Sequence, residues 1–287
     1  MPDLLSKDAL PPSSGIKISH GEFRLLSALI YKHFGIDLTQ KKTLLQTRLQ
    51  NVLRKGDFPS YRQFYEAVLA DPAGRAMSEL VNAVSTNHMY FYREKEHFDF
   101  LSQTALPEIT ARLRQEQSKD LRLWCAGCST GEEAYMLVMM MMEFLGSEYL
   151  LWEAGILATD ISEKALTHAR IGQYAQMTLA SLPETFRKKY FTRLPKGLWQ
   201  VKEHVKREVT LRRLNLMTPR FPFSKPFEII FCRNVMIYFD GPTIAALLSR
   251  FHQSTTPGGY LIISHSESLG RENKWFSYVK PGVYKKK

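Results

Sequence analysis

Four short apolar runs in the second half of the chain constrain its fold more than any other feature. They are Leu121–Cys125, Gly155–Thr159, Phe227–Cys232 and Gly259–Ser264. A glycine turn and a helix follow the first run, and a helical pattern over 161–170 follows the second. Strands that alternate with helices build a parallel, doubly wound α/β sheet. The sequence therefore predicts a Rossmann-like α/β domain.

The segment from about 190 to 214 interrupts this alternation. It contains the short β-like runs YFTR, GLWQV and EVTLRRL, and a Pro-Lys-Gly turn joins the first two. Such runs with tight turns are typical of antiparallel hairpins. We expect a small antiparallel β insertion that lies in the sheet or runs into it.

The part of the chain over 19–94 has a helical texture. Ser19-His-Gly-Glu22 fits a capping box, and apolar residues at helical spacing follow it. Further helical patterns cover 39–55, 60–70 and 75–84. We predict a small all-α domain over 19–94, preceded by a flexible tail over 1–18 that contains Pro, Ser and Gly.

The formal net charge of +11 indicates an acidic partner, which can be a nucleic acid, an anionic membrane or an acidic protein. Lys41, Arg48 and Lys55 repeat every seven residues, so they lie nearly on one line of the predicted second helix. This line is either a solvated face or a docking surface.

The composition favours a cytoplasmic protein without membrane insertion. The longest apolar stretch, Ala134–Leu145, is too short to span a bilayer and reads as a buried helix. Three cysteines do not form a disulfide framework, and the N-terminus lacks the pattern of a signal peptide.

The first motif with chemical content is LWCAGCSTGEEAY, over 123–135. Gly127 and Gly131 allow the backbone to approach a ligand after the first strand. The same residues contain a Cys-x-x-Cys pattern, which occurs in redox sites. The acidic pair Glu132 and Glu133 disfavours a thiolate there. A zinc site is also disfavoured, because only Cys232 remains as a third thiolate and no pair of histidines has ligand spacing.

Three further motifs carry polar residues at expected ligand positions. Asp160 ends the second strand, where an acid can hold ribose hydroxyls, although Asp160 or Ser162 could instead cap the next helix. Arg233 and Asn234 follow a buried strand directly. The aromatic segment over 85–94 contains the polar pair Asn87 and Arg93.

Together these motifs resemble the chemotaxis receptor methyltransferase (CheR) family. The matching segments are TNHMYFYRE, AGCSTGEEAYM, ATDI, Asn215-Leu216 and FEIIFCRNVMIYF, in the family's order, with KKTLLQTRL at 41–49 before them. The resemblance implies a class I methyltransferase sheet over 95–287 and the cofactor S-adenosylmethionine, which leaves as S-adenosylhomocysteine.

The resemblance also implies roles for individual residues. Arg93 and Tyr238 match residues near the transferred methyl group. Met89 stands where the family has a threonine, which removes a hydroxyl contact. The implied cofactor contacts are Asn87, Met89, Arg93, Glu132, Asp160, Asn215, Leu216, Asn234 and Val235.

The family's reaction is methyl transfer to glutamate carboxylates of chemoreceptors, which forms methyl esters during adaptation. We expect a cytoplasmic monomer that is recruited to membrane-bound receptors. We also expect it to dock mainly through the line of Lys41, Arg48 and Lys55, because these charges have one sign and are regularly spaced. A short turn over 193–197 that contains Pro195 leads us to expect no dependence on a receptor tail peptide at the insertion.

The rival functions are a nucleic-acid methyltransferase, which the charge suggests, and a cofactor-sensing receptor-binding module, which Met89 suggests.

Overall fold

The computed structural model describes residues 15–85, 89–270 and 273–287. The chain divides into two compact units, and each is considered by itself. The first unit contains residues up to Tyr31 together with Leu38–Val84, and the second contains Lys32–Asp37 and Ser85–Lys287.

The first unit is helical, as predicted. Its elements are α1 (His20–Phe34), whose last three residues belong to the second unit, α2 (Lys42–Lys55), α3 (Tyr61–Ala70) and α4 (Arg75–Val84). The capping box is confirmed, because the Glu22 N–H donates to Ser19 Oγ (3.2 Å) and the Ser19 N–H donates to Glu22 Oε2 (2.8 Å). The core of this unit includes Leu26, Leu45, Leu49, Tyr61, Phe64 and Leu80.

The predicted tail over 1–18 differs from the structure at its end. Ile18 is buried, and its N–H donates to Gln46 Oε1 (3.2 Å), so packed chain begins before residue 19. Residues 1–14 lie outside the described residues.

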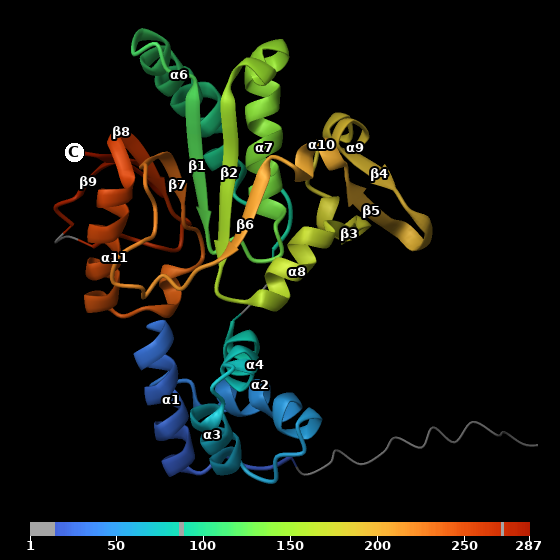
Figure 1. Ribbon diagram of the computed structural model, residues 1–287, viewed down its shortest axis with the longest axis vertical. Coiled ribbons are helices and arrows are strands. Elements are labelled where there is room, and N and C mark those ends of the chain that lie inside the picture. Colours follow the sequence, from blue (N-terminus) through green and yellow to red (C-terminus); the bar gives the residue numbers. More distant parts are fainter. Residues whose placement is uncertain (1–14, 86–88, 271–272) are drawn as a thin grey trace, which may run out of the picture. The chain divides into compact units, whose positions relative to one another are not determined.

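The second unit is built on a seven-stranded sheet, ordered β6-β2-β1-β7-β8-β10-β9 (Figure 1). Strands β6, β2, β1, β7 and β8 pair in parallel, whereas β10 is antiparallel to both β8 and β9. The predicted doubly wound sheet is confirmed, with two further strands near the C-terminus. The strands are β1 (Asp120–Ala126), β2 (Glu153–Asp160), β6 (Val209–Arg213), β7 (Phe227–Phe231), β8 (Thr255–Ile262), β9 (Phe276–Lys280) and β10 (Val283–Lys286).

Alternation along β1 separates the core into two layers. Leu121, Leu123 and Cys125 join one buried cluster with α6 (Leu106–Gln115) and α7 (Glu132–Leu145). Trp124 and Ala126 join the other cluster with α11 (Gly241–Ser254). Successive side chains of a strand point to opposite faces, so β1 is covered by helices on both sides. Figure 1 shows α7 and α11 flanking the sheet.

The methionine-rich helix α7 is a core helix, as its sequence predicts. The segment Glu132–Leu151 is long and apolar enough to cross a membrane, but more than half of its most apolar window, 56%, is buried within the protein. The α7 residues from Ala134 to Met141 are all buried. Met side chains fill irregular space between the sheet and its neighbours.

The β insertion has different limits from those predicted for 190–214. The small antiparallel sheet has the order β3-β5-β4 and consists of β3 (Gln173–Ala175), β4 (Phe191–Arg193) and β5 (Leu198–Val201). The EVTLRRL run is instead β6, which pairs in parallel with β2. Val209 and Leu211 of β6 pack on the main core, and this burial favours the large sheet over the small one.

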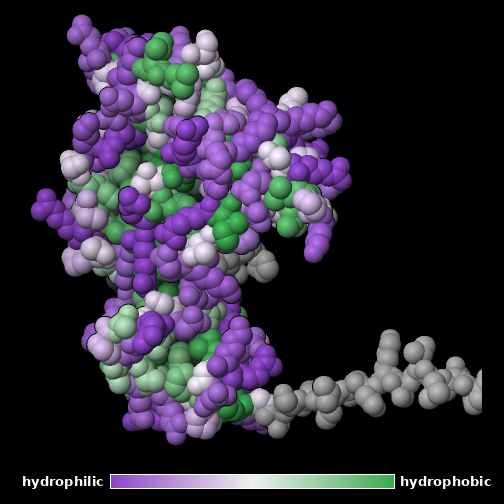
Figure 2. Space-filling model, turned by 45° about the vertical axis from the view of Figure 1, so that its right-hand side comes forward, coloured by the Kyte–Doolittle hydropathy of each residue, from purple (hydrophilic) through white to green (hydrophobic). Residues whose placement is uncertain are grey.

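Shorter elements connect these strands and helices. They are α5 (Lys95–Phe100), η1 (Leu101–Ala105), η2 (Gly146–Leu151), α8 (Glu163–Ile171), η3 (Gln176–Leu179), α9 (Glu184–Tyr190), η4 (Pro195–Gly197), α10 (Glu203–Lys206) and η5 (Met236–Tyr238). Figure 2 shows one face of the molecule, on which hydrophilic residues predominate and hydrophobic residues appear in scattered patches.

Candidate active site

The loop after β1 needs both of its glycines. Gly127 has φ +82°, and a Cβ there would lie 2.4 Å from Cγ2 of Val235, in the loop after β7. Gly131 has φ +99°, and a Cβ there would lie 2.9 Å from Cβ of Ala169 on α8. These glycines allow the β1 loop to approach its neighbours closely. The carboxyl ends of β1, β2 and β7 thereby form one compact edge.

Asp160 joins two loops at this edge. Its Oδ2 accepts the Ser129 N–H (2.9 Å) and its Oδ1 accepts the Ser162 N–H (2.8 Å). The helix-capping role belongs to Ser162, whose hydroxyl accepts the Ala165 N–H (3.1 Å) at the start of α8. Burial raises the pKa of Asp160, although the backbone donors favour its charged form. Each carboxylate oxygen has a further lone pair for a hydroxyl donor.

Glu132 provides a second buried carboxyl group at the start of α7. Thr130 Oγ1 donates to Glu132 Oε2 (2.6 Å), and burial raises the pKa of this glutamate. The Tyr174 hydroxyl donates to the Thr130 carbonyl oxygen (2.6 Å) and so holds the loop that precedes it. Two acceptor groups at the ends of β1 and β2 suit a ligand with several hydroxyl or ammonium donors.

Asn234, after β7, contains an unused acceptor. Its backbone has φ +60°, its N–H donates to Glu267 Oε2 (3.0 Å), and its Nδ2 donates to Ser264 Oγ (2.9 Å). Its Oδ1 is buried and accepts no hydrogen bond within the described part of the chain. A buried polar atom without a partner is costly, so this oxygen fits a donor group of a bound ligand.

Asn215 and Leu216 follow β6 at the same end of the sheet. The Asn215 Nδ2 donates to the His33 carbonyl oxygen (2.6 Å), and its Oδ1 accepts the Met217 N–H (3.0 Å). Leu216 is buried in the core layer that contains Trp124. The side-chain groups of both residues are therefore engaged within the protein.

Arg93 lies on a strained segment. The residues on either side of it, Tyr92 and Glu94, have φ values of +63° and +54°, which side chains other than glycine rarely adopt. Its guanidinium lies 3.8 Å from Met89 Sδ and 6.0 Å from the Tyr90 ring centroid. Strain of this kind concentrates at functional sites. Asn87 lies outside the described residues.

The expectation that Arg233 faces a ligand together with Asn234 is wrong. Its side chain is buried and pairs with Glu133 (2.8 Å) and Glu94 (3.3 Å). It also donates to the Arg93 carbonyl oxygen (2.6 Å). The sequence does not predict that Glu133 and Glu94 are its partners, although these acids lie in the motifs over 123–135 and 85–94.

A group that could coordinate a metal lies beside this network. The ligand atoms of Glu94, His97 and His265 are all within 4.8 Å of one another. However, Arg233 already provides a positive charge next to Glu94. Burial and Arg233 lower the pKa of His97 to about 4. Glu94, His97 and His265 therefore belong to an ion-pair network in which the Arg233 guanidinium is the cation.

The Cys-x-x-Cys motif does not have the surroundings of a redox site. Cys125 and Cys128 are buried, and burial raises the pKa of both thiols well above the usual value. The Cys125 thiol donates to Glu133 Oε1 (3.3 Å). A reactive cysteine requires an accessible thiolate, which this environment disfavours.

Tyr238 lies in η5, in the loop that follows Asn234 and Val235, and it is half-buried. Its carbonyl oxygen accepts the Asp37 N–H (2.8 Å). The structure thus brings Glu132, Asp160, Asn234 and Val235 to one edge and links Arg93 to it through Arg233.

The predicted docking residues lie in the helical unit. Lys41 precedes α2 and Lys55 ends it, and both are exposed. Arg48 is half-buried, and its guanidinium donates to the Val84 carbonyl oxygen at the end of α4. The line is therefore not uniform, because its middle member also supports the packing of two helices.

A glycine loop, two buried carboxyl groups and an unpaired amide oxygen at the carboxyl ends of a doubly wound sheet suit a nucleoside cofactor. The strand order and the antiparallel β10 suit a methyltransferase sheet, and residues 87–284 match a methyltransferase SAM-binding domain, so the chain is an S-adenosylmethionine-dependent methyltransferase.

The family is identified by two matches. The CheR methyltransferase SAM-binding domain matches residues 87–284, and the CheR methyltransferase all-alpha domain matches residues 21–85. The chain belongs to the CheR methyltransferase family, and its cofactor is S-adenosylmethionine.

Curated relatives align over most of their length. A chemotaxis protein methyltransferase of Borreliella burgdorferi is 40% identical over 272 residues, which cover 94% of this chain and 96% of the relative. A probable chemotaxis protein methyltransferase of Rhizobium etli is 35% identical over 250 residues, which cover 86% of this chain and 92% of the relative. The chemotaxis protein methyltransferase of Escherichia coli is 31% identical over 273 residues, which cover 94% of this chain and 92% of the relative.

Proposed function

We propose that this methyltransferase acts on glutamate side-chain carboxylates of chemoreceptors and forms methyl esters during adaptation. The observation that carries the proposal is the match of both domains to the CheR family, together with relatives named chemotaxis protein methyltransferases. The net charge of +11 also suits an acidic protein substrate.

The proposed cofactor site is the edge formed by the loops after β1, β2 and β7. Asp160 and Glu132 accept hydrogen bonds from hydroxyl and ammonium groups, and Asn234 Oδ1 accepts one from a donor of the base. Val235 provides an apolar wall beside Gly127. The family pattern adds Asn87, Met89, Asn215 and Leu216, of which Leu216 contributes packing through its buried side chain.

A glutamate substrate needs no general base. Its carboxylate has a reference pKa of about 4.3, so it is ionised and nucleophilic at neutral pH. When bound, the cofactor supplies a methyl group that its sulfonium makes electrophilic. The protein contributes position and exclusion of water, and orientation can lower the barrier by roughly 7–11 kcal/mol in favourable cases.

Arg93 and Tyr238 are the proposed residues nearest to the reaction. A guanidinium that gripped the attacking oxygen would stabilise the ground state and slow the reaction. We therefore assign Arg93 to a carboxylate at the edge of the site, which it can hold by a two-pronged contact. Tyr238 forms part of the wall that faces the methyl group.

Docking is assigned to the helical unit. Lys41 and Lys55 present positive charge at the two ends of α2, where an acidic receptor helix can lie. This would bring a cytoplasmic enzyme to membrane-bound receptors without inserting it into the membrane.

The test is methylation of purified receptor cytoplasmic fragments with a radiolabelled methyl donor. Glutamate esters release labelled methanol in alkali, whereas methyl groups on nitrogen do not. A fragment with its candidate glutamates replaced by alanine serves as the control. Absence of label, or label that is stable to alkali, contradicts the proposal.

A further inference from the structure

A basic groove lies outside the cofactor edge, along the free side of β6. It has a volume of about 400 Å³ and is lined by residues of α7, α8, α10 and β6 and of the turn before β6. Four of its lining residues are cations, Arg170, Lys206, Arg207 and Arg212, and one is a carboxylate, Glu203, which gives a net charge of +3.

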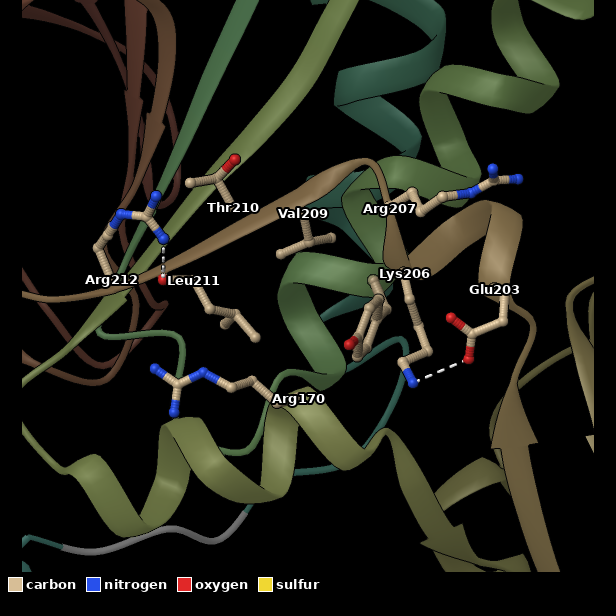
Figure 3. A pocket seen from close by; sticks show the side chains of 9 residues that line it. Arg170, Glu203, Lys206, Arg207, Val209, Thr210, Leu211 and Arg212 are labelled. Carbon is tan, nitrogen blue, oxygen red and sulfur yellow. Dashed lines mark hydrogen bonds and ion pairs between the residues drawn. The ribbon is translucent and has the colours of Figure 1, made fainter.

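The cations are distributed along the groove. Figure 3 shows Arg170 and Arg212 toward one end of the view and Lys206 and Arg207 toward the other. A single small anion would need convergent donors, whereas a row of carboxylates on an extended or helical segment needs separated ones. The arrangement therefore fits a chain of acidic side chains.

Two of these cations already bind glutamates of the protein itself. Arg170 pairs with Glu163 (2.7 Å) and Lys206 pairs with Glu203 (3.0 Å). Both side chains of the Arg170–Glu163 pair are 47% exposed, so this pair is weak and can exchange with other carboxylates. In the other pair Glu203 is 74% exposed, whereas Lys206 is only 20% exposed. Arg207 and Arg212 have no carboxylate within ion-pair distance in the described part of the chain.

The rest of the lining favours protein over nucleic acid. Val209 and Leu211 are half-buried and form an apolar floor. The aromatic residue of the lining, Tyr135, is buried, and its hydroxyl donates to the Ala169 carbonyl oxygen (2.6 Å). The groove thus offers no exposed ring for base stacking, which single-stranded nucleic acids use.

We propose that this groove binds a glutamate-rich segment of the protein substrate and so forms a second docking site for it. The proposal rests on the proposed function, because it extends the recognition of an acidic receptor beyond the residues on α2. A second contact would raise the effective concentration of the target glutamates at the active site.

The first test measures binding without methyl transfer. A fluorescein-labelled polyglutamate peptide is titrated with the wild type, with Arg207→Glu/Arg212→Glu, and with the control Lys119→Glu/Arg220→Glu. The control reverses two exposed cations outside the groove and changes the net charge equally. We expect the groove variant to bind at least about tenfold more weakly and the control to change little. Equal losses in both variants, or absence of wild-type binding, overturn the proposal.

The second test separates this inference from the proposed function. The milder variant Arg207→Gln/Arg212→Gln should raise the KM for a receptor fragment and leave kcat unchanged, and circular dichroism checks its fold. Ester formation with an unchanged KM overturns the groove and leaves the proposed function intact. If polyglutamate binding depends on the groove but no glutamate ester forms on the receptor fragment, the proposed function is contradicted and the groove proposal stands. Tighter, groove-dependent binding of oligonucleotides than of polyglutamate identifies a nucleic-acid surface and overturns the inference.

Discussion

The guanidinium of Arg233 donates to the carbonyl oxygen of Arg93 at 2.6 Å, across 140 residues of sequence. The same guanidinium pairs with Glu133 at the start of α7. One buried side chain thus connects the loop after β7, the first turn of α7 and the strained segment that carries Arg93.

Replacing Arg233 with methionine should destabilise the protein. It leaves Glu133 buried without its cation, and breaking a buried pair in this way costs about 3–5 kcal/mol. Chemical denaturation measures the loss, and Arg114→Met, which breaks the exposed pair with Glu148, is the matched control. Similar losses in the free energy of unfolding for the two variants would show that the buried pair stabilises the protein no more than the exposed pair does.

Asp160→Asn should weaken the binding of S-adenosylhomocysteine. Losing a hydrogen bond to a charged group costs about 1–3 kcal/mol, which corresponds to roughly 5- to 150-fold in affinity. Ser162→Ala is the control, since it removes the cap of α8 and costs about 1 kcal/mol of stability while leaving the carboxylate in place. Calorimetry gives both affinities. An unchanged affinity for Asp160→Asn removes this residue from the cofactor site.

The stability should fall as the pH falls from 6.5 toward 4. The folded-state pKa of His97 is lowered to about 4, so between these values the unfolded chain binds a proton that the folded chain does not. Urea denaturation at about pH 7 and about pH 5 measures the difference. His97→Gln should show a smaller fall than the wild type, and an equal fall would locate the effect elsewhere.

Reversing the charges of Lys41 and Lys55 together should raise the KM for receptor fragments and leave the cofactor affinity unchanged. The salt dependence of association should also flatten, because fewer charges attract the acidic partner. Arg48 is left intact, since its contact with the Val84 carbonyl oxygen supports the helical unit. Wild-type methylation rates across salt concentrations would make this helix a solvated face.

The sequence was most informative where burial is continuous. Strands β1, β2, β7 and β8 are apolar runs covered on both faces, and they were predicted near their observed positions. Strands β9 and β10 were missed because their lysine-containing runs are only partly buried and depend on pairing with β8. The EVTLRRL run looks like a hairpin strand, and only its pairing with β2 shows that it belongs to the main sheet.

The sequence predicted which polar residue types lie at the site, but it did not predict which side chains pair with one another. Asp160 and Glu132 lie at the ends of readable strands and turns, where acids are expected. The pairing of Arg233 with Glu133 spans 100 residues, and no local pattern predicts which of two adjacent acids receives it. The unpaired Asn234 Oδ1 likewise depends on the packed positions of Ser264 and Glu267.

The burial of the cysteines has a practical consequence for measuring receptor encounters. The chain contains three cysteines, and all of them are buried with raised thiol pKa values. Thiol-specific dyes react with exposed thiolates, so the native protein should give a low labelling background. A cysteine introduced on the surface would then carry a single fluorophore or spin label, without prior removal of the native thiols.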